Sequence, residues 1–384
     1  MQTSGKIRAY LDNSATTMPC KEAVDAACFA MGEGFFNPSA AYGPAIPVIK
    51  AMNSCRGAVK EVLGQRSGEV IFTSGGTEGN FIAILGAMKR RGARLALTTA
   101  VEHPAVLECV KSFEHVIIPV DSSGLVDLDL FEETVKKNED IGLVSAMEIN
   151  NETGAILPVA QMAKIVNESS GALFHCDGVQ GFLHIKERDL KDVDTYAISA
   201  HKIHGLKGSG ALWIKEGVSL GQVIYGGGQE KGIRSGTENT PGIFALEAAI
   251  RADDGSAMDT VRGLKLRLYS GIMDIFPAAK VNGPDPQNPR ESAPHILNIS
   301  FEGILSEVLL HALEGDGVFV STGSACAARQ SRPSHVLSAM GVDPQMIRSA
   351  VRFSLGRYTT REEIDLALES LKKHLPVLAK FRRR

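Results

Sequence analysis

The chain has 384 residues, of which 44% are hydrophobic and 22% charged, and its net charge at pH 7 is −3. At roughly 100–200 residues per domain, this length predicts two or three domains. The charge balance lacks the basic excess of a nucleic-acid-binding protein, and no apolar run reaches the roughly 20 residues of a membrane-spanning helix.

The N-terminus and the cysteines favour an intracellular setting. No apolar stretch follows the first charged residues, so no signal peptide is evident and we expect a cytoplasmic protein. None of the six cysteines belongs to a Cys-x-x-Cys pair. Their scarcity and spacing argue against a disulfide framework and against a structural zinc site.

Short apolar runs alternate with amphipathic stretches between about residues 69 and 215. We expect seven buried strands there, at 69–73, 94–99, 115–120, 141–147, 172–177, 195–199 and 210–214. Helices are expected between them, among others at 104–111, 128–137 and 159–168. This alternation predicts βα crossovers and a largely parallel sheet that helices cover on both faces.

The pattern changes after the glycine-rich stretch 226–236. The elements expected next are two helices and a strand, at 241–252, 264–276 and 296–301. Thr360 and Glu363 form a capping box in front of a final helix. We therefore expect a second, α+β domain from about residue 255 onward.

Small and polar residues from Thr73 to Asn80 directly follow the first expected strand and precede a helix. Backbone N–H groups and the helix dipole favour an anion at such a position, and the natural one is a phosphate. Hydroxyls of Ser74 and Thr77 would add hydrogen bonds. The spacing matches no nucleotide-binding motif. An ordinary capped turn between strand and helix is the alternative.

Asp177 ends the strand expected at 172–177, and parallel sheets place their ligands at the carboxyl ends of strands. A carboxylate at this position can pair with a positively charged group of a ligand. The neighbours His175 and Cys176 raise the possibility of a metal site, but adjacent strand residues point to opposite faces, so the three cannot easily converge on one ion.

Lys202 lies in a short run of small and polar residues just after the strand expected at 195–199. A lysine in such a site, with its pKa lowered, can form a Schiff base, and a solvated surface lysine is the alternative. His103 also follows a strand and could lie flat on a ring, unless it is a helix cap or a core histidine.

Together these features match the needs of pyridoxal phosphate, which are an amine for its aldehyde, a carboxylate for its pyridine nitrogen and an anion site for its phosphate. Lys202, Asp177 and the 74–77 loop supply that set.

Two further residues are candidates for contact with a substrate. Cys326 lies among small, polar and basic residues, which suits a reactive thiolate better than a structural cysteine, although an incidental loop cysteine is the alternative. Arg352 stands inside a strand-like run, where burial requires an anionic partner. A substrate carboxylate would serve, and an internal salt bridge is the alternative.

Taken in order, these motifs resemble the cysteine desulfurases, a group within the class V aminotransferase family. The matching segments are 11–17, 73–78, 102–106, 150–154, 177–180, 199–202, 226–230, 234–237, 324–326 and 352–356. They span nearly the whole chain. The stretch from Cys326 to Ser334 resembles the branch that serves iron–sulfur assembly and nitrogenase maturation, in which the cysteine lies on a long loop.

The resemblance implies an α/β fold of the fold-type-I pyridoxal-phosphate enzymes, with a mostly parallel seven-stranded sheet. The larger domain would comprise residues 15–254. The smaller α+β domain would comprise residues 1–14 and 255–384 and carry the cysteine loop.

It also implies how pyridoxal phosphate would be bound. Lys202 would hold the cofactor covalently and shuttle protons, and Asp177 would pair with the pyridinium nitrogen. Gln180 would bond the ring hydroxyl, and His103 would stack on the ring and act as acid and base. The phosphate ligands would be Gly76, Thr77, Ser199 and His201.

The implied substrate is L-cysteine. Asn151 and Arg352 would hold its carboxylate, Asn151 touching the cofactor as well. The Cys326 thiolate would attack the substrate sulfur, which leaves a persulfide for an acceptor protein and releases alanine. Thr237 would reach the phosphate of a partner subunit, so the resemblance implies a homodimer. It implies no metal, no nucleic acid and no membrane.

The chain departs from the family pattern at three positions. Phe81 replaces an asparagine, Tyr42 a histidine and Leu206 a proline. None removes a catalytic group, but they leave room for a specialised paralogue. The rival interpretations are a selenocysteine lyase or a cystine or cysteine β-lyase of the same fold and, from another class, a non-catalytic sulfur-trafficking protein. Retention of all four of Lys202, Asp177, His103 and Cys326 argues against the last.

Overall fold

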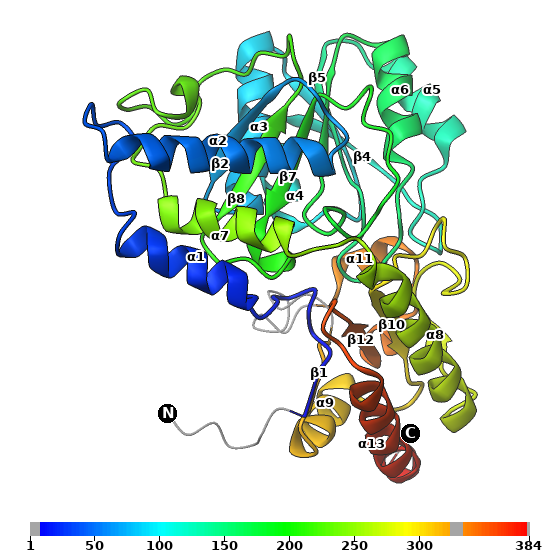
Figure 1. The fold of residues 1–384 in the computed structure, drawn as a ribbon. Coiled ribbons are helices and arrows are strands. Elements are labelled where there is room, and N and C mark those ends of the chain that lie inside the picture. Colours follow the sequence, from blue (N-terminus) through cyan, green and yellow to red (C-terminus); the bar gives the residue numbers. More distant parts are fainter. Residues whose placement is uncertain (1–7, 323–332, 382–384) are drawn as a thin grey trace.

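The computed structural model describes residues 8–322 and 333–381. A seven-stranded sheet of order β2-β8-β7-β6-β5-β3-β4 forms its centre (Figure 1). Its strands are β2 (Glu69–Thr73), β3 (Leu95–Thr99), β4 (Glu114–Ile118), β5 (Ile141–Met147), β6 (Leu173–Asp177), β7 (Thr195–Ser199) and β8 (Gly210–Ile214). Strand β8 is antiparallel to both neighbours, and all other pairs are parallel. The predicted sheet is confirmed.

Strand β4 differs most from its predicted bounds, because it ends at Ile118 instead of residue 120. It lies at the edge of the sheet and pairs only with β3, from Leu95↔Glu114 to Thr99↔Ile118. Since β3 itself ends at Thr99, nothing remains for the following residues to pair with. The apolar Val120 continues the sequence pattern without continuing the ladder.

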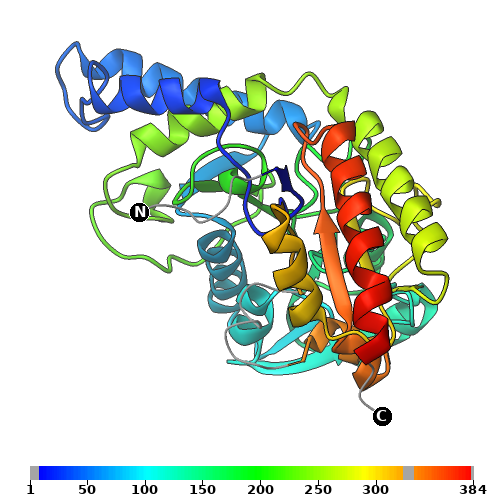
Figure 2. The ribbon, with the colours of Figure 1, turned by 90° about the horizontal axis from the view of Figure 1, so that it is seen from below.

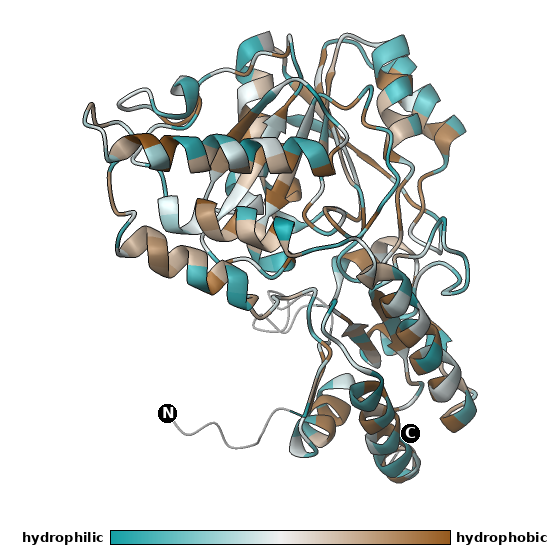
Figure 3. Ribbon diagram, viewed as in Figure 1, coloured by the Kyte–Doolittle hydropathy of each residue, from teal (hydrophilic) through white to brown (hydrophobic). Residues whose placement is uncertain are grey.

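Helices cover both faces of the sheet, as predicted. They are α2 (Ala45–Val62), α3 (Gly76–Arg91), α4 (Pro104–Val110), α5 (Leu128–Lys137), α6 (Val159–Ser169) and α7 (Thr240–Arg251). Helix α1 (Lys21–Met31) packs on α7. Helices α3 and α4 pack on one face, and α2, α5, α6 and α7 on the other. In Figure 3 the central strands are largely brown, whereas much of the outward surface of α5 and α6 is teal.

A second core lies beside this layered unit, around helices α8 (Ala257–Ile275), α9 (Ser306–Gly315) and α13 (Arg361–Leu378) (Figure 2). Two small sheets complete it, one of β9 (Lys280–Val281), β10 (Ile296–Ser300) and β12 (Ala350–Ser354), the other of β1 (Ala9–Tyr10) and β11 (Val318–Phe319). The short helices α11 (His335–Ala339) and α12 (Pro344–Ile347) precede β12. The chain start thus packs with the C-terminal part.

Helix α8 starts earlier than the sequence pattern predicts. The helix begins at Ala257 rather than at residue 264, and Met258 and Val261 in its first turns are buried in the second core. The polar residues Asp259 and Thr260 between them masked the apolar stripe. The capping box of Thr360 and Glu363 at the start of α13 is confirmed. Over the described ranges, no helix is both long and apolar enough to cross a membrane.

Candidate active site

A pocket of about 210 Å³ opens where the parallel strands β5, β6 and β7 end. It is lined by ten of the residues that the sequence singled out, namely Gly76, Thr77, His103, Asn151, Asp177, Gln180, Ser199, His201, Lys202 and Arg352. Ser14, Ala15, Asn80, Met147, Ile149 and Val179 complete the lining. Thr237 is exposed and does not line this pocket, and Cys326 lies outside the described residues.

The N-terminus of α3 forms one wall of the pocket. Helix α3 starts at Gly76, after Gly75 with a φ of 150°, a conformation that favours glycine. A Cβ on Gly76 would lie 2.4 Å from Cγ2 of Val179, so only glycine fits here. Ser74, whose hydroxyl was a further candidate, does not line the pocket. The first-turn N–H groups, which a helix leaves without partners inside the helix, therefore lie at the pocket that Gly76 and Thr77 line.

Glu78 in this first turn does not prevent an anion from binding there. Its Oε1 pairs with Nε of Arg234 at 3.1 Å, and its Oε2 accepts a hydrogen bond from the backbone N–H of Ser74. Because the guanidinium offsets the carboxylate charge, the dipole of this 16-residue helix still favours a negative group at Gly76.

Asp177 is 4% exposed and is held at both carboxylate oxygens. Its Oδ2 accepts from Asn80 Nδ2 at 2.7 Å, and its Oδ1 accepts from the backbone N–H of Val179 at 3.0 Å. These bonds fix the position of the carboxylate at the pocket wall.

A chain of hydrogen bonds continues from Asp177 behind the pocket. Asn80 Oδ1 lies 2.9 Å from His175 Nε2, and His175 Nδ1 lies 2.8 Å from the Thr195 hydroxyl. Burial lowers the pKa of His175 to about 3, so the ring is neutral. His175 therefore donates to Asn80 through Nε2 and accepts from Thr195 at Nδ1. It supports Asp177 through Asn80 and does not join it in a metal-ligand set.

Asn80 is the site residue that sequence reasoning missed. It is 1% exposed, although asparagine is a poor interior residue for a helix. Asn80 lies four residues after Gly76, so it is one helical turn further along α3 on the same face of the helix. A polar residue at that spacing, on a face that is otherwise apolar, was the available signal, because a buried amide requires partners.

Lys202 ends the short 3-10 turn η1 (Ala200–Lys202) that follows β7. Its Nζ donates to the backbone oxygens of Ser14 and Ala15, the latter at 2.9 Å. The next residues of that N-terminal segment hold the lysine loop from outside, because Thr17 donates from both N and Oγ1 to the His201 carbonyl. Lys202 is thus a pocket lysine and not a solvated surface lysine.

His103 and His201 are both neutral imidazoles. His103 caps α4, where its Nδ1 accepts from the backbone N–H of Ala105 at 3.1 Å, so the ring proton is on Nε2. Burial lowers its pKa. Burial and the neighbouring Lys202 lower the pKa of His201 to about 4. His103 is therefore the helix cap that the sequence offered as an alternative, and it also lines the pocket, where stacking on a ring stays a prediction.

Arg352 forms the internal salt bridge that the sequence offered as an alternative, and it also lines the pocket. Its side chain is 2% exposed in β12, its Nη2 pairs with Asp12 Oδ1 at 2.7 Å, and its Nη1 donates to the Asn151 carbonyl at 2.8 Å. The internal salt bridge is therefore present, yet the guanidinium lines the pocket. Its Nε is buried with no hydrogen-bond partner among the described residues.

Gly178 fixes the direction in which the chain leaves Asp177. A Cβ at this position would lie 1.9 Å from a ring carbon of Tyr196, which is fully buried and donates through its hydroxyl to Glu148. We expect Gly178→Ala to lower the free energy of unfolding by about 1–3 kcal/mol, because the ring cannot move aside. Urea denaturation measures this change.

Gly263→Ala is the matched control for Gly178→Ala. Gly263 lies inside α8, and no atom beyond its own helix backbone lies within 4 Å of an added Cβ. This substitution is expected to raise the free energy of unfolding by up to about 1 kcal/mol through helix propensity. Equal effects of the two substitutions would contradict the steric argument.

The chain is similar to a known protein family and to several known proteins. Residues 9–367 match the family described as Aminotransferase class-V. A cysteine desulfurase of Cereibacter sphaeroides is 39% identical over 374 residues, 95% of each chain. The cysteine desulfurase IscS of Clostridium botulinum is 38% identical over 382 residues, 95% of this chain and 94% of its own. A solved NifS-like protein superposes with a TM-score of 0.88 at 36% identity, covering 97% of this chain and 100% of its own.

Proposed function

Because the chain belongs to the class-V aminotransferase family and is a pyridoxal-phosphate-dependent cysteine desulfurase, we propose that the pocket at the strand ends holds cofactor and substrate. The observation that carries this proposal is the presence, in one pocket, of a lysine amine, a buried carboxylate and a helix N-terminus.

The residues present fit pyridoxal phosphate. Lys202 would hold the aldehyde, and Asp177 would pair with the ring nitrogen. Gly76, Thr77, Ser199 and His201 would bind the phosphate. Gln180 would bond the ring oxygen, and His103 would stack on the ring. When bound, this cofactor supplies an electron sink that weakens the Cβ–S bond of cysteine.

The protein's own side chains bind the substrate and transfer the protons. Arg352 binds the substrate carboxylate, and its buried Nε gives it a spare donor although Asp12 already occupies Nη2. Asn151 lies at the same wall, where its carbonyl orients that guanidinium. Lys202 shuttles protons during the reaction. His103 can donate the proton on its Nε2.

We propose Cys326 as the sulfur acceptor. Its thiolate forms an S–S bond to the substrate sulfur while the Cβ–S bond breaks and its electron pair returns to carbon. A proton delivered to that carbon completes alanine. The persulfide then passes to an acceptor protein in the cytoplasm, for iron–sulfur cluster assembly or another use of sulfur.

A second copy of the chain would complete the site. Thr237 is exposed, as a residue that reaches a partner's phosphate must be. Large apolar side chains are exposed on and around α1 and α2, namely Phe29, Met31, Phe35, Tyr42 and Ile46. A homodimer interface would cover them. We also propose that 15–254 and the pair 1–14 and 255–384 act as two domains, because each contains its own hydrophobic core.

Product analysis tests the proposed reaction. Purified protein with pyridoxal phosphate, a thiol reductant and L-cysteine is expected to release alanine and sulfide in equal amounts. Pyruvate and ammonia would instead identify a β-lyase. Faster turnover of selenocysteine than of cysteine would identify a selenocysteine lyase. Bound cofactor with no product from any of these substrates would contradict the assignment.

A further inference from the structure

Two histidines contact Gln180, which lines the proposed cofactor pocket: His295 contacts its side chain and His184 its backbone oxygen. Gln180 is 4% exposed, and its Nε2 lies 3.0 Å from the backbone oxygen of Ser14. Because a carbonyl oxygen only accepts hydrogen bonds, the Gln180 atom that faces it belongs to the NH2 group. The amide oxygen Oε1 therefore faces the other way, toward His295.

His295 supplies the donor for this amide oxygen. Its Nε2 lies 3.4 Å from Gln180 Oε1, whereas its Nδ1 is buried with no hydrogen-bond partner in the described part of the chain. Burial lowers the pKa of His295 well below its usual range, so the ring carries one proton. That proton is on Nε2, because a buried lone pair without a partner costs less than a buried N–H without one, and Gln180 Oε1 needs a donor.

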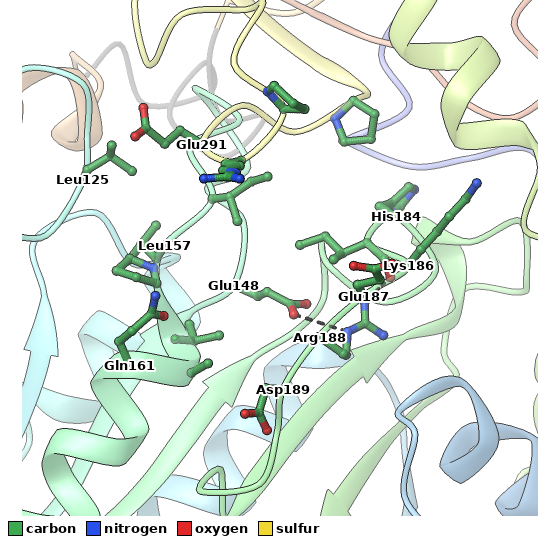
Figure 4. A pocket seen from close by; sticks show the side chains of 18 of the residues that line it. Leu125, Glu148, Leu157, Gln161, His184, Lys186, Glu187, Arg188, Asp189 and Glu291 are labelled. Atoms are coloured by element: carbon green, nitrogen blue, oxygen red, sulfur yellow. Dashed lines mark hydrogen bonds and ion pairs between the residues drawn. The ribbon is translucent and has the colours of Figure 1, made fainter.

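His184 makes the second contact with Gln180. Its Nδ1 donates to the Gln180 backbone oxygen at 2.9 Å, and its ring stacks on His295 with centroids 4.0 Å apart and planes 14° from parallel. The stack limits rotation of the His295 ring. His184 also lines a second cavity of about 700 Å³, in which Figure 4 shows it near the ion pair of Glu148 and Arg188. His184 thus lies between that cavity and Gln180.

We propose that His295, backed by His184, is a positioning residue that fixes the Gln180 amide with its NH2 group toward the cofactor's ring oxygen. The inference rests on the proposed role of Gln180. With no donor at Oε1, only the hydrogen bond to the Ser14 oxygen still holds the amide, and an amide that turned would place its oxygen against a ring oxygen that also only accepts. A fixed NH2 group stabilises the anionic form of that ring oxygen.

His295→Phe tests the inference because it keeps the ring stacked on His184 and removes the N–H donor. We expect the dissociation constant of pyridoxal phosphate, measured by titrating the apoprotein and following Trp213 fluorescence, to rise about fivefold. The pH midpoint of the bound cofactor's visible absorbance should rise by about half a unit. His295→Gln, which returns an NH2 group, should restore both values.

Lys265→Met is the matched control. Lys265 is fully buried and donates to the Ser292 hydroxyl at 2.9 Å and the Ala293 carbonyl at 2.7 Å, so it anchors the segment that carries His295 without touching Gln180. It should lower the free energy of unfolding and leave the dissociation constant and the absorbance midpoint unchanged. If Lys265→Met reproduced the shifts of His295→Phe, those shifts would reflect loosening of the segment, and the inference would be wrong.

Gln180→Ala separates this inference from the proposed function. A shifted absorbance midpoint in Gln180→Ala with none in His295→Phe would overturn the role of His295 and leave that of Gln180 standing. An unchanged midpoint in Gln180→Ala would overturn the proposed role of Gln180 and the inference with it.

Discussion

Replacement of Cys326 by alanine is expected to reduce sulfide release from L-cysteine by at least about a thousandfold, because no other group is proposed to attack the substrate sulfur. The pocket that would hold the cofactor is built from other residues, so the variant should still bind pyridoxal phosphate and show its visible absorbance. Sulfide release in the presence of a reductant and the absorbance spectrum together measure the two effects.

Two other cysteines provide matched controls for Cys326→Ala. Cys28 is exposed on α1, so Cys28→Ala tests whether accessibility alone makes a cysteine important. Cys109 is half-buried, and burial raises the pKa of its thiol to about 11, so little thiolate is present near neutral pH. Both variants should turn over like the unmodified protein. Mass spectrometry should find one added sulfur atom on Cys326 after a turnover without reductant, and sulfur on Cys28 instead would contradict the assignment.

The parts of the fold that could be predicted from the sequence are those that depend on local pattern. Strands β2, β5, β7 and β8 have the predicted bounds, because each is a continuous apolar run that ends at a polar or glycine-rich turn. The rule that ligands lie at the carboxyl ends of parallel strands then placed Asp177 and Lys202 at one edge of the sheet.

Contacts between distant segments could not be predicted. Asn80 and His175 are 95 residues apart, and His295 and Gln180 are 115 residues apart. Each pair depends on how side chains of different elements pack, which no local pattern encodes. The Asp12–Arg352 salt bridge joins residues 340 positions apart, so the sequence offered an internal salt bridge for Arg352 only as an alternative and did not name its partner.

The structure places the three departures from the family pattern outside the pocket lining. Phe81 is 41% exposed and Tyr42 is 53% exposed, the latter with its ring edge toward Phe36. Leu206 packs with Cys20 and neighbouring alanines in a small cluster beneath α1. Changes at these positions act on the surface and on loop packing, where a specialised partner would make contact, and leave the pocket chemistry intact.

Asp177→Asn is expected to lower kcat/KM for L-cysteine by about a hundred- to a thousandfold, because the proposed positive ring nitrogen would lose its charged partner. The substitution can remove the charge and keep the hydrogen bonds. With an amide at position 177, Asn80 turns over, so that its oxygen accepts from the new NH2 group and its own NH2 group faces His175. His175 then accepts at Nε2 and donates from Nδ1 to the Thr195 hydroxyl, which can accept as well as donate.

This reversal makes Asp177→Asn a test of charge alone. Its free energy of unfolding, measured in urea, should therefore stay within about 1 kcal/mol of the unmodified value. Asn80→Ala provides the reciprocal change, because it keeps the carboxylate and removes one of its two hydrogen bonds. That variant should lose no more than about tenfold in kcat/KM. If Asp177→Asn were as mildly impaired as Asn80→Ala, the carboxylate would serve to hold the strand end in place rather than to stabilise a charge on the cofactor.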